Sequence, residues 1–179
     1  MLTRENTGLV VVDVQGKLAT LVEDSDAVVA NITTLVKGAK TLKLPIVWLE
    51  QNPEKLGATV KPIGDELGGL KPVSKFTFDG CGEQRFLKQV KKSGIRYWLV
   101  CGIETHICVY QTAKSLRTLG FVVELISDCV SSRTAANKQV GVNKMMSLGI
   151  GISSLEMCLY ELVGDCRDPE FKTILKLIK

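Results

Sequence analysis

Short apolar runs rich in β-branched residues alternate along the chain with segments in which apolar residues recur at helical spacing. This alternation is typical of βαβ units, in which a helix connects two neighbouring parallel strands. The run from Gly8 to Gln15 is almost wholly apolar until its polar end, as expected of a central strand covered on both faces. The pattern predicts an α/β fold, a three-layer α/β/α sandwich with a central, mostly parallel sheet.

The same patterns predict the individual elements. Further strands are expected at residues 45–50, 97–101, 121–127 and 150–153, and helices at 25–42, 83–92, 105–119, 133–148, 155–163 and 169–178. Prolines and glycines are dense in residues 51–74, where we expect a long surface excursion without regular structure. No linker or repeat interrupts the pattern, so we expect a single domain over residues 1–179.

Composition excludes several classes of protein. With 45% hydrophobic residues the chain can build one substantial core, and 23 basic against 19 acidic side chains indicate neither a disordered polyelectrolyte nor a strongly basic nucleic-acid binder. No apolar run approaches the roughly 20 residues that span a bilayer. Arg4, Glu5 and Asn6 stand where a signal peptide would be apolar, so we expect a cytoplasmic protein.

The six cysteines show no C-x-x-C pair, and four of them lie in apolar stretches. Such cysteines are typical of reduced, buried thiols in the cytosol, so we expect neither disulfides nor a structural zinc site. Cys101 in particular lies inside an apolar strand, which indicates core packing.

Ligands of an open parallel sheet bind beyond the carboxyl ends of its strands, so polar residues at those ends are candidate site residues. Lys75, which follows the excursion, is expected to point back into the same crevice. The candidates at the strand ends are Asp13 and Gln15, Glu50 and Gln51, and the stretch 102–108.

Cys108 is the most informative of these residues. If Thr105 is an N-cap, Cys108 occupies the third position of a helix, where free backbone N–H groups favour the thiolate and lower the pKa of the thiol. The same N–H groups could hold an oxyanion. The alternative is a small buried side chain in a helix without a chemical role.

Asp13 offers a carboxylate that can take a proton from a thiol, or it merely caps a loop at the strand end. Lys75 is either its partner or one of many solvated surface lysines. His106, the only histidine, is rejected as the base because two helical steps turn it roughly 200° away from Cys108. Phe76, Phe78 and Trp48 line a pocket or pack in the core.

Four segments together resemble the isochorismatase-like family of cysteine hydrolases, which is related to nicotinamidase and N-carbamoylsarcosine amidohydrolase, and the resemblance covers nearly the whole chain. A further segment, residues 50–59, is similar to a branch of small members that lack an assigned substrate. The family implies a Rossmann-like topology. The four segments are residues 12–15, 73–78, 102–112 and 125–133, which occur in the family's order.

The resemblance implies a triad in which Cys108 is the nucleophile, Asp13 the base and general acid, and Lys75 the cation that holds Asp13 and favours the thiolate. It also implies a cis peptide bond before Glu104, and we infer an oxyanion hole from the N–H groups of Glu104 and Cys108. The expected substrate-binding residues are Gln15, Glu50, Phe76, Phe78 and Ile103, with Glu104 beside them.

Two departures from related enzymes shape the expected activity. Nicotinamidases of this family carry an Asp-x-His-x-His metal site, whereas this chain has Glu50-Gln-Asn there and one histidine in all, so neither a metal ion nor another cofactor is expected. Isochorismatases cleave an enol ether without a cysteine nucleophile, so Cys108 favours acyl chemistry. The leading hypothesis is a metal-independent hydrolase that cleaves a small amide, carbamoyl or related acyl substrate through a cysteine thioester.

The competing hypothesis is a catalytically idle family member that acts as an interaction or scaffold protein. A dinucleotide-binding or receiver-like module has little support, since no G-x-G-x-x-G follows the first strand and no acidic cluster suited to phosphoryl transfer is present. The expected partner is a small-molecule substrate, without nucleic acid or membrane. The family also implies a homo-oligomer, a dimer or larger; Leu155, Leu159 and Leu162 fit its interface or the core equally well.

Overall fold

The computed structural model describes all residues from Met1 to Lys179. Six strands form one sheet in the order β3-β2-β1-β4-β5-β6, and every neighbouring pair is parallel. The strands are β1 (Thr7–Val12), β2 (Ile46–Gln51), β3 (Val73–Lys75), β4 (Tyr97–Ile103), β5 (Val122–Ser131) and β6 (Gly151–Ser153).

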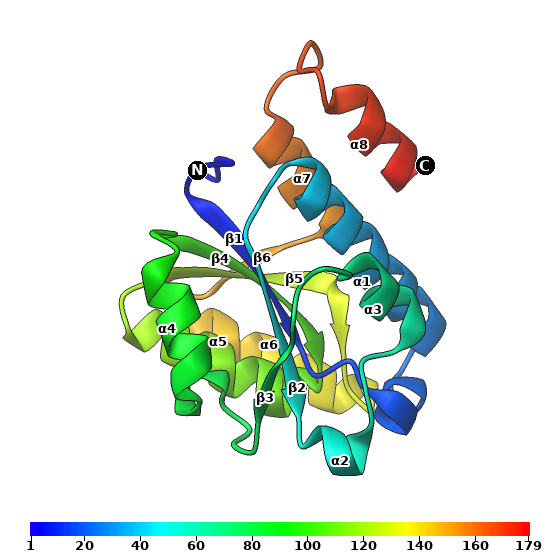
Figure 1. Cartoon of the computed structure of the whole chain (residues 1–179), viewed down its shortest axis with the longest axis vertical. Helices are drawn as coiled ribbons and strands as arrows, with labels where there is room; N and C mark the ends of the chain where they lie inside the picture. The colour runs from blue at the N-terminus through cyan, green and yellow to red at the C-terminus, as the bar shows by residue number, and fades with distance from the viewer.

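Helices cover both faces of this sheet (Figure 1). One layer contains α1 (Ser25–Thr41), α3 (Lys61–Glu66), α7 (Leu155–Val163) and α8 (Phe171–Ile178), and the other contains α4 (Gln84–Lys92), α5 (Tyr110–Thr118) and α6 (Ala135–Ser147). Short elements lie at the ends of strands: η1 (Gly16–Thr20), α2 (Pro53–Leu56), η2 (Gly80–Gly82) and the π-helical turn η3 (Thr105–Val109). The expected three-layer α/β/α sandwich with a parallel sheet is confirmed.

The two faces of β1 explain why its sequence is apolar after Thr7. All six residues are buried, and alternate side chains enter different cores. Leu9 and Val11 pack in the core beneath α1 and α7, whereas Val10 and Val12 pack beneath α4, α5 and α6. A strand enclosed on both sides has no face for polar residues until it ends at Asp13.

The expectation that residues 51–74 lack regular structure is wrong. Two short helices, α2 and α3, and the edge strand β3 lie in this segment. Pro53 stands at the first position of α2 and Pro62 at the second position of α3, where a proline's missing N–H has no helical partner to lose and its fixed φ suits the helix. These prolines therefore start helices here and do not interrupt them.

Helix α7 has the expected bounds, and α6 begins two residues later than expected, directly after a capping residue. Thr134 and Ser154 accept hydrogen bonds from the N–H groups of Asn137 and Met157 and so cap α6 and α7. Helix α1 begins at residue 25, as expected, and Asp24 precedes it as an N-cap without a side-chain capping bond. Strand β5 continues to Ser131, beyond the expected end at residue 127. None of the helices combines the length and apolar character that crossing a membrane requires.

Leu155, Leu159 and Leu162 are buried in the core of the chain itself. These three residues therefore contribute to the core of the chain and do not form an exposed interface. Cys101 is likewise fully buried in that core, and all six cysteines are free thiols, as expected.

Candidate active site

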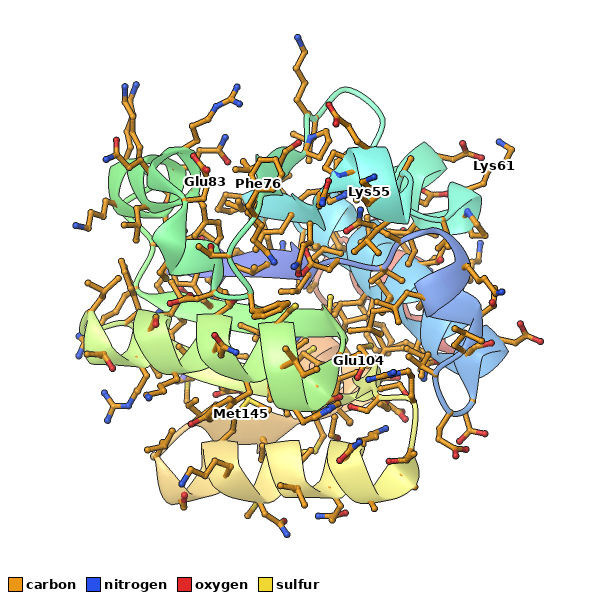
Figure 2. All side chains as sticks on the ribbon, turned by 90° about the horizontal axis from the view of Figure 1, so that it is seen from below. Lys55, Lys61, Phe76, Glu83, Glu104 and Met145 are labelled. Atoms are coloured by element: carbon orange, nitrogen blue, oxygen red, sulfur yellow. The ribbon has the colours of Figure 1, made fainter.

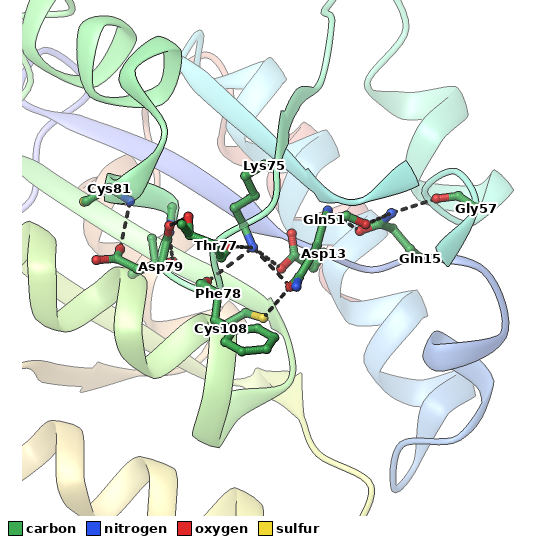
Figure 3. Close-up of polar contacts among 12 residues, drawn as sticks. Asp13, Gln15, Gln51, Gly57, Lys75, Thr77, Phe78, Asp79, Cys81 and Cys108 are labelled. Carbon is green, nitrogen blue, oxygen red and sulfur yellow. Dashed lines mark hydrogen bonds and ion pairs between the residues drawn. The ribbon is translucent and has the colours of Figure 1, made fainter. Parts of the chain in front are cut away.

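A pocket of about 240 Å³ opens at the carboxyl ends of the central strands. It contains Asp13 after β1, Gln51 at the end of β2, Ile103 and Glu104 at the end of β4, and Cys108 in η3. Figure 3 shows Asp13, Lys75, Gln51 and Cys108 converging at this point. A larger groove of about 580 Å³ runs along α1, but it contains none of the candidate residues.

Lys75 and Asp13 form a buried ion pair beneath the pocket. The Lys75 Nζ lies 2.6 Å from Asp13 Oδ2, and the two side chains are 0% and 2% exposed. Lys75 also donates to the carbonyl oxygens of Thr77 and Phe78, each at 3.2 Å. Burial raises the pKa of Asp13 above its ordinary value, because the loss of hydration outweighs the attraction of Lys75. The raised pKa makes the carboxylate a better proton acceptor.

Cys108 is 7% exposed, and its thiol faces both Asp13 and Gln51. The expectation of a lowered thiol pKa is wrong: burial, followed by the charge of Asp13, raises the pKa of Cys108 to about 12, and Lys75 offsets this only in part. Thr105 is also not the N-cap, since the helical turn starts at Thr105 itself after Glu104. At neutral pH the resting thiol therefore keeps its proton until a base removes it.

Glu104 follows the cis peptide bond that links it to Ile103. Its backbone N–H donates to no group of the chain, while its carbonyl accepts from Ile107 and Val109 in η3. The buried side chain accepts a hydrogen bond from Nε of Arg133 at 2.5 Å. This arrangement leaves an N–H donor beside the pocket, where an oxyanion hole requires one.

Gly102 allows β4 to turn into this arrangement. Its φ of +124° lies in a region that favours glycine, and a Cβ at this position would lie 2.0 Å from the carbonyl oxygen of Val12. The register between β4 and β5 shifts between Val100 and Gly102. The glycine therefore permits the close approach of β1 and β4 immediately before the site.

Gln15 and Glu50 do not line the pocket; both hold the backbone behind it. Gln15, fully buried, donates from Nε2 to the carbonyl oxygens of Gln51 at 3.1 Å and Gly57 at 2.7 Å, and its Oε1 accepts from the Gln51 N–H at 2.7 Å. Glu50 Oε1 accepts from the N–H and hydroxyl of Thr59, both at 2.7 Å. Their polar groups are already used within the chain.

Gln15→Met is therefore expected to lower the free energy of unfolding by about 2 kcal/mol, because three backbone groups lose their partner while the side-chain volume is kept. Urea unfolding monitored by circular dichroism measures this change. Gln89→Met, on the exposed face of α4, is the matched control. An unchanged unfolding midpoint in Gln15→Met would contradict the assigned clamp.

Only some of the aromatic and aliphatic residues expected to bind substrate lie at the pocket. Ile103 and Phe78 line the pocket, whereas Phe76 is 78% exposed and points away from it. Figure 2 shows the molecule from the end of the sheet at which α2 lies, with Phe76 and Glu104 labelled. Trp48 is partly buried, packs against the core and donates to the Thr59 hydroxyl. Phe76 and Phe78 would share one face of a regular strand, but β3 ends at Lys75 and residues 76–79 bend, which lets the two side chains diverge.

Sequence reasoning missed part of the pocket wall. Leu18 in η1, Leu56 in α2 and Ile107 in η3 line it, and only tertiary contacts bring the first two here. Gln51 was noted at a strand end without a role. Its position in register with Lys75, on the strand that pairs with the edge strand β3, is the signal that could have assigned one.

His106 contacts neither Asp13 nor the Cys108 thiol. The Nδ1 of His106 lies 3.0 Å from the Ser132 hydroxyl and 3.5 Å from Glu104 Oε2. No group of three His, Cys, Asp or Glu side chains is arranged to hold a metal ion. A site that works without a metal stays a prediction.

Comparisons with known proteins establish the family of the chain and its fold. Residues 7–157 match the family described as "Isochorismatase domain". The "Secreted isochorismatase effector Isc1" of Phytophthora sojae is 34% identical over 177 residues, covering 96% of this chain and 83% of that protein.

Two solved structures share the fold over nearly the whole chain. The "MAR1 Ribonuclease" of Caenorhabditis elegans superposes with a TM-score of 0.93 at 30% identity, covering 99% of this chain and 91% of the other. The YcaC gene product of Escherichia coli, described as an octameric hydrolase of unknown specificity, has a TM-score of 0.93 at 22% identity and coverages of 99% and 88%. The chain therefore belongs to the isochorismatase family, and this membership supports a hydrolase.

Proposed function

We propose that this protein is a metal-independent cysteine hydrolase, one domain over residues 1–179, that cleaves a small amide, carbamoyl or related acyl compound through a thioester on Cys108. The observation that carries the proposal is a pocket lined by Asp13 and Cys108, with Lys75 paired to Asp13 beneath it. The pocket, at about 240 Å³, is smaller than the roughly 300–1,000 Å³ of sites for drug-sized ligands, which supports a small substrate.

The first step transfers the thiol proton to Asp13. Cys108 with a pKa of about 12 is protonated at neutral pH. The raised pKa of Asp13 reduces the difference in pKa between the thiol that gives the proton and the carboxylate that accepts it. Lys75 stabilises the carboxylate that must be present before the transfer and the thiolate that results from it. The thiolate forms only as it attacks, so the resting enzyme carries a neutral thiol.

The thiolate then forms a bond with the substrate's carbonyl carbon, and the carbonyl π electrons move to the oxygen. The N–H groups of Glu104 and Cys108 stabilise that oxyanion. When the oxyanion collapses, the carbon–nitrogen bond breaks and the protonated Asp13 gives its proton to the leaving nitrogen. The products of this half-reaction are a free amine or ammonia and an acyl-thioester on Cys108.

Water completes the cycle. The carboxylate of Asp13 accepts a proton from a water molecule, whose oxygen attacks the thioester carbon. The carbon–sulfur bond breaks, and the departing sulfur recovers a proton from Asp13. The carboxylic acid product leaves, and the ion pair with Lys75 and the neutral thiol are restored.

Cys108→Ala is expected to abolish hydrolysis, because the chain then lacks the atom that forms the covalent intermediate. The protein is incubated with a panel of small primary amides, carbamoyl compounds and single-stranded RNA, and product release is measured together with the intact mass of the protein. Cys81→Ala is the control: Cys81 has a pKa raised to about 12 by burial but lies outside the pocket.

Hydrolysis that persists in Cys108→Ala would refute the cysteine mechanism. If wild-type protein cleaves no compound and forms no adduct on Cys108, the alternative of an interaction or scaffold protein is favoured. Cleavage of RNA alone would instead align the chain with the activity that the C. elegans neighbour's description names.

We also propose that the protein forms a homo-oligomer in the cytoplasm. The E. coli neighbour is described as octameric. Large exposed apolar side chains, among them Val140, Met146 and Met157, remain on the surface of the single chain. Light scattering on the purified protein measures the assembly, and a monomer at micromolar concentration would contradict the proposal.

A further inference from the structure

Gln51 is the residue of the pocket for which neither the sequence nor the proposed mechanism provides a role. It ends β2 and pairs in register with Lys75 of β3. Its backbone is fixed from both sides by the buried Gln15, as described above, and the next N–H, of Asn52, donates to the Lys75 carbonyl at 2.9 Å. These hydrogen bonds fix the backbone from which the side chain starts.

The orientation of the Gln51 carboxamide is determined by its neighbours. Its Oε1 accepts from the Cys108 thiol at 3.2 Å and from Lys75 Nζ at 3.5 Å (Figure 3). An ammonium group has three donors and no acceptor, so the oxygen of the carboxamide, and not its nitrogen, must face Lys75. The Nε2 group, with two N–H donors, then points elsewhere and donates to no group of the chain.

These free donors and the free N–H of Glu104 come from the ends of two different strands. Gln51 ends β2 and Glu104 follows β4, with β1 and Asp13 between them in the sheet. Both residues line the same pocket. A ligand whose reacting carbon meets the sulfur therefore has a donor for its carbonyl oxygen at Glu104 and a second donor, at Gln51, for another acceptor.

We propose that Gln51 determines specificity by donating from Nε2 to a second oxygen adjacent to the scissile carbonyl, so that the preferred substrates are amides of 1,2-dicarbonyl type. The inference rests on the proposed function, since it takes Cys108 to be the group that meets the substrate. The Cys108 thiol and Lys75 donate hydrogen bonds to Oε1 of Gln51, and the substrate accepts a hydrogen bond from Nε2. An acyl compound with one carbonyl oxygen uses only the Glu104 donor.

Two alkylating reagents with the same leaving group test this preference. Methyl bromopyruvate carries a second carbonyl next to its ketone, whereas bromoacetone has the ketone alone. In each case the thiol displaces bromide, and labelling of Cys108 is followed by mass spectrometry. The ratio of the two rate constants cancels any change in thiol reactivity, because both reagents meet the same sulfur.

Gln51→Glu keeps an oxygen for Lys75 and Cys108 but removes both N–H donors, and Gln51→Met removes both kinds of group. The rate ratio of methyl bromopyruvate to bromoacetone is expected to fall about tenfold in each variant, which corresponds to the loss of about 1.4 kcal/mol. Gln89→Glu, on the exposed face of α4, should keep the wild-type ratio. Thermal unfolding of each variant verifies that the comparison is made on folded protein.

A ratio within twofold of wild type in either Gln51 variant would overturn the assignment. The outcome is separable from that of the proposed function. If wild-type protein cleaves no amide but the ratio falls, the hydrolase proposal fails and the role of Gln51 in ligand recognition stands. If amides are cleaved and the ratio is unchanged, the hydrolase proposal stands and this inference fails.

Discussion

Lys75→Met is expected to lower the free energy of unfolding by about 3–5 kcal/mol, the largest stability loss in the pocket. The variant keeps the length of the side chain but leaves the carboxylate of Asp13 buried without its cation. Desolvation already raises the pKa of Asp13 in the presence of Lys75. Loss of the Lys75 cation raises the pKa of Asp13 further. Urea unfolding at pH 7 measures the change, with the exposed Lys71→Met as the control.

The sign of the pH dependence follows from this raised pKa. An aspartate whose folded-state pKa lies above the unfolded value of about 3.9 contributes most to stability below that value, and the contribution is lost as the pH rises. The deficit of Lys75→Met relative to wild type should therefore be smallest near pH 4 and grow towards pH 7. Asp13→Asn combined with Lys75→Met should recover part of the loss at pH 7, because no buried charge remains.

A deficit that is the same at both pH values, or a double variant no more stable than Lys75→Met, would show that Lys75 contributes packing alone. The double variant also keeps the test usable if Lys75→Met does not fold at neutral pH.

Asp13→Asn is expected to lower the hydrolytic rate about 10²–10⁴-fold while making Cys108 more reactive towards alkylating reagents. Hydrolysis needs a group that accepts and returns a proton, which an amide side chain cannot do. Alkylation needs only the thiolate, and the negative charge of Asp13 is one of the causes that raise the pKa of Cys108. Removing that charge while Lys75 remains lowers the pKa, and each unit of decrease raises the thiolate fraction about tenfold.

These opposite effects separate a proton-transfer role from a structural one. A damaged pocket would lose hydrolysis without a gain in alkylation at a fixed pH. The rate of hydrolysis is measured on an amide that the wild-type protein cleaves, and alkylation of Cys108 is measured at pH 8 by mass spectrometry. Slower alkylation in Asp13→Asn would contradict the assigned electrostatic coupling.

The sequence allows much of the sheet to be predicted, because its central strands are enclosed by helices and must be apolar throughout. The run that forms β1 could be recognised by this property alone. The short edge strand β3 could not, since three residues carry no periodicity and the sheet edge imposes no such requirement. Helices α2 and α3 could not be predicted, because a proline can either break the interior of a helix or stand in its first turn, and the sequence does not distinguish the two cases.

The candidate site was predictable in position but not in electrostatics. Asp13, Lys75 and Cys108 lie at strand ends or beside them, where a parallel sheet places its ligands. The thiol's pKa depends on burial and on the distance to Asp13, which the sequence does not contain, and so its direction was wrong. Gln15 and Glu50 also lie at strand ends, but neighbouring loops engage their side chains, a contact that only the fold reveals.

The rate of alkylation of Cys108 as a function of pH reports most directly whether the carboxylate of Asp13 acts on the thiol, as the proposed mechanism requires. With a pKa of about 12, the wild-type rate should be low at pH 7 and still be rising at pH 10, where a small free thiol in solution has reached its plateau. The profile should move to lower pH in Asp13→Asn. A wild-type plateau below pH 8 that Asp13→Asn leaves unchanged would contradict the account.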